Sequence, residues 1–110
     1  MPSYEMRWRF STSAVKGMTG KPHDREAAGR QLVEGFGGKL HHYYFVLGEY
    51  DGLAIAEFPD NVAAAAMSMR AGSTGGFARF ETHPLMTAEE ARRAMEKVNQ
   101  SDIDYRAPNA

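Results

Sequence analysis

The sequence predicts an α+β fold in which a four-stranded antiparallel sheet carries its helices on one face. Segments with the two-residue period of a strand alternate with segments of helical period, in the order β-α-β-β-α-β plus a C-terminal helix. The connection between the second and third strands is too short for a crossover, so these two strands form a hairpin. This split β-α-β order predicts two helices on one sheet face and an uncovered opposite face.

The first strand is predicted at residues 4–10, where apolar and charged side chains alternate. The apolar side consists of Tyr4, Met6, Trp8 and Phe10, and the charged side of Glu5, Arg7 and Arg9. Hydroxyl residues 11–13 can cap a short helical turn around residues 14–18, which Gly17, Gly20 and Pro22 should keep from extending.

Asp24 can cap the next helix, which has Ala28, Leu32 and Phe36 on its apolar side and ends at Gly37-Gly38. The second strand is predicted at residues 40–47 and the third at residues 53–58. They flank a polar turn at residues 47–52, around which we expect the chain to be organised.

Asp60 caps a further helix, and its apolar stripe is predicted to be Val62, Ala66 and Met69. The fourth strand follows at residues 77–85, where Pro84 favours a position at a sheet edge or a strand end.

Thr87 and Glu90 form a capping box that begins the C-terminal helix, which should end near Asn99. Its apolar seam is Ala91, Met95 and Val98. The tail at residues 101–110 either frays or lies across a neighbouring surface, and we favour the second.

The 110 residues suit a single domain, residues 1–110, with one modest core. The formal net charge of -1 predicts neither nucleic acid nor a membrane surface as a partner. The chain has no Cys, and its N-terminal residues 1–10 lack the apolar run of a signal peptide, so we expect a cytoplasmic protein. Because one sheet face lacks cover, we expect a homodimer or higher oligomer in which each copy supplies half of a barrel.

The turn Gly48-Glu49-Tyr50-Asp51, followed by a strand and by Glu57-Phe58-Pro59-Asp60, resembles the signature of the GYD domain family. Further matching features occur in the same order along nearly the whole chain: Ser11, Gly17, Arg25, Gly37-Gly38-Lys39, Tyr44, Leu85-Met86-Thr87, Glu90 and Tyr105-Arg106-Ala107-Pro108. The resemblance implies a ferredoxin-like domain of the dimeric α/β-barrel group. That fold is shared with cofactor-free monooxygenases, isomerases and haem-handling proteins, and the resemblance implies no established activity.

Tyr50 and Asp51 admit two interpretations. In the structural one, which we favour, Asp51 hydrogen-bonds backbone amides near the turn while Tyr50 covers the hairpin. In the functional one, Asp51 acts as a base or ligand anchor beside a phenol donor at the mouth of the barrel.

Arg7 and Arg9 share a face of the first strand, and Arg79 of the fourth strand can join them. Glu5, Glu57 and Glu81 are available as partners, so a structural lattice of ion pairs across the subunit interface is favoured over an anion-binding pocket.

His41 and His42 are adjacent in a strand, so regular pleating should send their rings to opposite faces and prevent them from chelating one ion. His42 and Tyr44 should share a face as a donor and acceptor pair. We therefore predict no metal site and no cofactor.

The function that these observations favour is binding of a small anionic or aromatic molecule in the cleft between sheet and helices. The candidate ligand-binding residues are Arg7, Arg9, His42, Tyr44, Tyr50, Asp51 and Arg79. One alternative is a cofactor-independent oxygenase or isomerase that uses Asp51, His42 or Tyr44 as acid and base groups. Another is a structural or interaction protein, and the sequence leaves open whether the protein is an enzyme.

Overall fold

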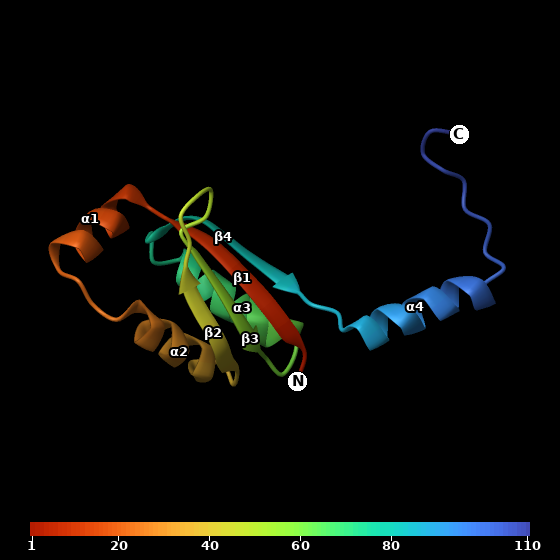
Figure 1. Cartoon of the computed structure of the whole chain (residues 1–110), viewed down its shortest axis with the longest axis horizontal. Coiled ribbons are helices and arrows are strands. Elements are labelled where there is room, and N and C mark those ends of the chain that lie inside the picture. The colour runs from red at the N-terminus through yellow and green to blue at the C-terminus, as the bar shows by residue number, and fades with distance from the viewer.

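The computed structural model describes all 110 residues, and Figure 1 shows the arrangement of its helices and strands. The elements in chain order are β1 (Ser3–Phe10), α1 (Thr12–Gly20), α2 (Arg25–Gly35), β2 (Lys39–Phe45), β3 (Gly52–Glu57), α3 (Asn61–Gly72), β4 (Phe77–Pro84) and α4 (Ala88–Gln100). None of the helices combines the length and the apolar character needed to cross a membrane.

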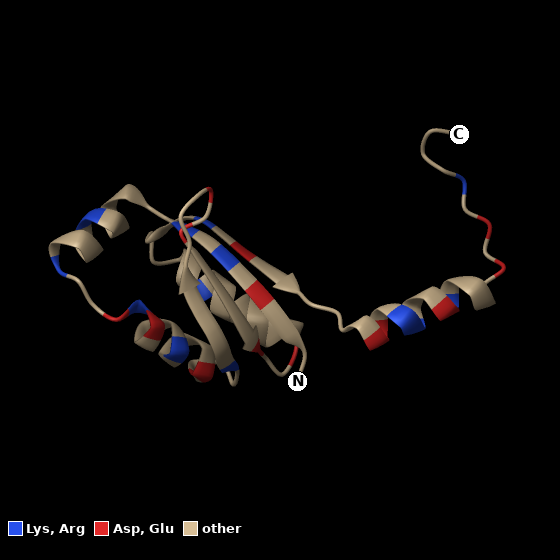
Figure 2. Cartoon of the chain, viewed as in Figure 1, with Lys and Arg blue, Asp and Glu red and all other residues tan.

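The four strands form one antiparallel sheet in the order β2-β3-β1-β4, which confirms the predicted ferredoxin-like arrangement. β1 is central, between β3 and β4, and the Pro84-bearing strand β4 lies at an edge. The charged residues of β1 and β4 are therefore neighbours on the sheet surface (Figure 2).

The core lies on the helix-facing side of the sheet. Its central row is the apolar side of β1, namely Tyr4, Met6, Trp8 and Phe10, each between 1% and 7% exposed. The alternation predicted for residues 4–10 is thus confirmed, and it defines both faces of the sheet, because the Glu and Arg residues between these positions face away from the helices.

The helix α1 is longer than the sequence predicted. Instead of a turn around residues 14–18 it spans Thr12–Gly20, nine residues, and the Ser11 hydroxyl accepts a hydrogen bond from the Ala14 amide at 3.2 Å. A glycine inside a helix costs only about 1 kcal/mol, which the cap offsets. Ala14 and Met18 also pack against the core.

The predicted apolar stripe of α3 was wrong. Val62 and Met69 are 77% and 73% exposed, whereas Ala64, Met67 and Ala71 are buried. Apolar residues occur almost all round this Ala-rich helix, so its sequence period cannot select a buried side. The side of α3 that packs on the sheet is the one on which Ala64 and Ala71 permit close approach.

The capping box of α4 is present as predicted, with the Glu90 amide donating to the Thr87 hydroxyl at 3.0 Å and the Thr87 amide donating to the Glu90 carboxylate at 3.1 Å. The backbone hydrogen bond from Thr87 lowers the pKa of Glu90. However, α4 extends away from the sheet (Figure 1), and its seam residues Met95 and Val98 are 64% and 73% exposed. The tail at residues 101–110 is exposed and covers no surface of its own chain.

Trp8 and Gly52 form the closest sheet contact in the core. They are directly paired between β1 and β3, and a Cβ atom added to Gly52 would lie only 2.2 to 2.5 Å from three atoms of the Trp8 indole. Only a residue without a side chain permits the indole to lie flat across β3 at this point.

We expect Gly52→Ala to destabilise the protein by about 1–3 kcal/mol, because the buried indole must leave its rotamer. Urea unfolding followed by circular dichroism measures this change. Gly17→Ala is the control, since an added Cβ there has no atom within 4 Å and should stabilise α1 by about 0.5–1 kcal/mol. Equal stabilities of the Gly52→Ala variant and the parent would contradict the close-contact argument.

Candidate functional site

A cavity of about 480 Å³ lies between the helix-facing side of the sheet and the helices α1, α2 and α3. Fifteen of its 22 lining residues are hydrophobic, and the cavity opens to the surface. The helix side is formed chiefly by Ala14 and Met18 of α1 and by Ala28 and Leu32 of α2. Small residues in these helices leave the space unfilled.

Aromatic rings supply the sheet side of this cavity. The Trp8 indole stacks on Phe80 of β4, with ring centroids 6.0 Å apart and planes at 13°, and it lies 5.2 Å from the ring of Tyr43 in β2. The indole can extend over β3 toward Tyr43 because Gly52 has no side chain, although the Tyr43 ring is tilted by 44° against it. This aromatic surface can accept a planar apolar group.

The polar side chains at the cavity wall include Trp8, Arg25 and Tyr43. Trp8 is 4% exposed, and its Nε1 donor is buried without a hydrogen-bond partner, as is Nε of Arg25. Burial raises the pKa of Tyr43, partly opposed by the charge of Arg25 and by a hydrogen bond with it. The Tyr43 phenol therefore stays protonated near neutral pH and can donate a hydrogen bond.

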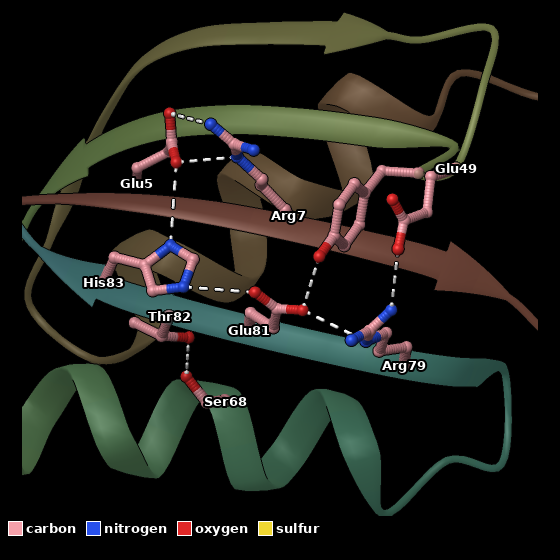
Figure 3. A network of polar contacts seen from close by, with 9 residues as sticks. Glu5, Arg7, Glu49, Ser68, Arg79, Glu81, Thr82 and His83 are labelled. Carbon is pink, nitrogen blue, oxygen red and sulfur yellow. Dashed lines mark hydrogen bonds and ion pairs between the residues drawn. The ribbon is translucent and has the colours of Figure 1, made fainter.

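The opposite face of the sheet carries a network of ion pairs along β1 and β4 (Figure 3). Arg7 Nε lies 2.8 Å from Glu5, and Arg79 lies 3.1 Å from Glu81 and 3.2 Å from Glu49. His83 lies between Glu81 at 3.1 Å and Glu5 at 3.6 Å. The guanidinium groups of Arg7 and Arg79 are thus neutralised by carboxylates of their own chain, and the lattice across a subunit interface stays a prediction.

Tyr50 joins the hairpin to this network. Its hydroxyl donates to Glu81 at 2.7 Å, and its ring lies beneath the guanidinium carbons of Arg7 at 5.8 Å and Arg79 at 5.5 Å. The hydrogen bond from Tyr50 lowers the pKa of Glu81 and raises that of Tyr50 itself. The hydrogen bond to Glu5 likewise raises the pKa of Arg7.

Asp51 holds the hairpin against the end of β1. Its carboxylate accepts from the Phe10 amide at 2.9 Å, and its own amide donates to the Trp8 carbonyl at 2.8 Å. The β1 register shifts against β4 between Arg9 and Phe10, and the Asp51 carboxylate satisfies the amide that follows this shift. The amide that Asp51 binds belongs to β1, whereas the sequence predicted a hydrogen bond to backbone amides near the turn.

The remaining predicted residues also lie outside the cavity. Arg9 donates to the Glu49 carbonyl at 2.7 Å, and His42 stacks on Tyr44 with centroids 6.2 Å apart and planes at 9°. Both of these β2 residues are exposed. None of the seven candidate ligand-binding residues lines the cavity: Arg7, Arg9, His42, Tyr44, Tyr50, Asp51 and Arg79 lie on the open face or in the hairpin.

The prediction that His41 and His42 point to opposite faces was wrong. The β2–β3 register shifts between Leu40 and His42, so His41 is an extra residue in a bulge. His42 is opposite Ile55, and His41 Nε2 reaches Glu57 on the same face at 3.5 Å. A bulge breaks the strict alternation of a strand. No group of three or more His, Cys, Asp or Glu side chains in the chain could hold a metal ion.

The family model of the GYD domain matches residues 4–95. The chain belongs to the GYD domain family. The matched range extends from β1 into α4, so the cavity and the ion-pair face both lie within the GYD domain. Among curated proteins, none matches the chain.

Three cavity residues of this GYD domain were missed as site candidates in the sequence. Trp8 was assigned only to the apolar side of the first strand, Arg25 only to the family resemblance, and Tyr43 to no role. A sequence signal existed for Trp8, because it is the only Trp of the chain. No sequence signal places Arg25 beside Tyr43, because α2 and β2 meet only in the fold.

We expect Asp51→Ala to lower the stability of this GYD domain by about 1–3 kcal/mol, because the Phe10 amide loses its acceptor. Asp51→Asn retains a side-chain oxygen that can accept from this amide, so it should lose less stability than Asp51→Ala. Chemical unfolding of both variants and the parent gives the comparison. Unchanged stability in Asp51→Ala would refute the structural role and return Asp51 to the functional candidates.

Proposed function

We propose that this GYD domain protein binds a small, largely apolar organic molecule in the cavity between the sheet and the helices. The observation that supports the proposal is the cavity itself, with its aromatic surface of Trp8, Tyr43 and Phe80. Its volume of about 480 Å³ lies within the range of small-molecule sites, which are mostly apolar with a few polar groups.

The geometry favours binding over catalysis. The acid and base candidates Asp51, His42 and Tyr44 lie away from the cavity, and the Asp51 carboxylate is occupied by a backbone amide. A general base has to come within hydrogen-bond reach of the proton that it removes. An enzyme acting in this cavity would need other residues for that step.

The uncharged fluorescent probe N-phenyl-1-naphthylamine tests this proposal, with Trp8 as an internal reporter. Because the chain has a single Trp and it lines the cavity, bound probe should quench Trp8 emission by energy transfer. Ala28→Phe fills the cavity and should weaken binding at least about tenfold, equivalent to about 1.4 kcal/mol.

Ala27→Phe is the matched control for that experiment, since Ala27 is the exposed neighbour in α2 and does not line the cavity. It should leave probe affinity unchanged. Equal affinities of the two variants, or binding without quenching of Trp8, would refute the cavity as the site.

We also propose that the protein forms a homodimer or higher oligomer through the open sheet face. The β3 side of this face carries Leu53 and Ile55, and Tyr44 of β2 is 58% exposed beside them. The Arg7 and Arg79 charges of the β1 and β4 side are paired within the chain, so a second copy could cover them without leaving unpaired ions.

Sedimentation velocity at micromolar concentration should therefore give at least twice the mass of the chain. Ile55→Arg introduces a charge into the open face and should shift the protein to monomer, with circular dichroism as the check on folding. The control is Val62→Arg, which alters an exposed residue of α3 on the other side of the sheet. A monomeric parent protein would exclude this proposal.

A further inference from the structure

The charged residues around the cavity are of one sign. Arg25 and Arg70 line it, and no Asp or Glu does. The net charge of the chain is -1, so this is a local separation of charge rather than a property of the whole protein. An anion entering the cavity would meet no like charge in the wall.

Arg25 is free to bind such an anion, because no carboxylate pairs with it. Its NH1 group lies 3.2 Å from Nε2 of His23, a neutral acceptor when the Nδ1 proton of that ring is donated to the Lys21 carbonyl at 3.2 Å. The acidic neighbours in sequence are engaged elsewhere: Asp24 caps α2 by accepting from the Ala27 amide, and Glu26 pairs with Arg30 at 3.1 Å. Arg7 and Arg79 on the open face have carboxylate partners instead.

Two further polar groups of the cavity residues are donors. The Tyr43 hydroxyl stays protonated, and the buried Trp8 Nε1 proton has no acceptor in the chain. Trp8 Nε1 lies against Gly52 and is closed to water, so the donors that remain for a ligand are the Tyr43 hydroxyl and the guanidinium group of Arg25. The side chains that wall it offer positive charge and protons, and the ligand has to bring negative charge and lone pairs.

We propose that the ligand is a planar apolar monocarboxylate, with its carboxylate on Arg25 beside Tyr43 and its apolar body against Trp8 and Phe80. This inference rests on the proposed function and names the ligand class for the same cavity. The guanidinium fork matches a carboxylate with two parallel hydrogen bonds. Arg25 is the Arg or Lys residue of the wall that lies beside Tyr43, so one carboxylate is enough to occupy this donor pair; Arg70 is the only other Arg or Lys in the wall.

Two probes of one shape test the charge requirement. Naphthalene-2-carboxylate and its neutral carboxamide are titrated separately into ¹⁵N-labelled full-length protein at neutral pH, and amide and indole NMR signals are followed. The single Trp gives one indole Nε1 signal, which reports on the cavity directly. We expect both probes to shift this signal and the carboxylate to bind at least about tenfold more tightly than the carboxamide.

Variants then assign the preference to Arg25. Arg25→Met should remove the difference between the two probes while leaving carboxamide binding intact. Arg30→Met is the matched control, because it removes the same charge from the same helix at a residue that pairs with Glu26 and does not line the cavity. It should keep the preference for the carboxylate.

The outcomes separate this inference from the proposed function. Equal affinities for the two probes in the parent protein overturn the carboxylate assignment and leave a neutral apolar ligand in the cavity, and this test needs no variant. A carboxylate preference that survives Arg25→Met overturns the role of Arg25. Absence of binding by either probe, together with failure of N-phenyl-1-naphthylamine to bind, overturns the proposed function as well.

Discussion

The contact of the Trp8 indole with the bare backbone of Gly52 is the constraint on which the rest of the structure depends. It allows a large ring system to lie flat across β3, where it meets Tyr43 on one side and Phe80 on the other. This aromatic surface leaves room beneath helices that face it with several small residues, among them Ala14 and Ala28. The cavity thus arises from one missing side chain in the sheet and several short ones in α1 and α2.

The segment that characterises the family acts on both faces of the sheet through three consecutive residues. Tyr50 lies over the open face between two guanidinium groups, and Asp51 binds the end of β1. Gly52 then admits Trp8 on the helix side. The Gly-Tyr-Asp turn is therefore an architectural element, and it influences the cavity only indirectly, by holding β1 and β3 in the register that pairs Trp8 with Gly52.

The two faces differ in how their arginines are neutralised. On the open face, acidic residues of β1, β4 and the hairpin pair with Arg7 and Arg79. At the cavity, the acidic neighbours of Arg25 bind a helix amide and Arg30 instead. Arg25 can thus bind an external anion more readily than Arg7 or Arg79 can. The difference lies in their surroundings, because a paired guanidinium must give up its partner before it binds another.

Much of the fold followed from local patterns: the strand at residues 4–10 from strict alternation, the helix starts from Ser11, Asp24, Asp60 and Thr87, and the family from its turn. Local patterns failed in the Ala-rich α3, where apolar residues occur on nearly every side, and at His41, where a bulge breaks the alternation of the strand. The candidate site was predicted in the right layer, between sheet and helices, with residues that lie elsewhere. What the sequence by itself determined was the order, ends and alternation of the elements, because these depend on neighbouring residues. Only the tertiary structure decided which arginines are left without a carboxylate partner at the cavity, because that depends on which side chains of separate elements meet.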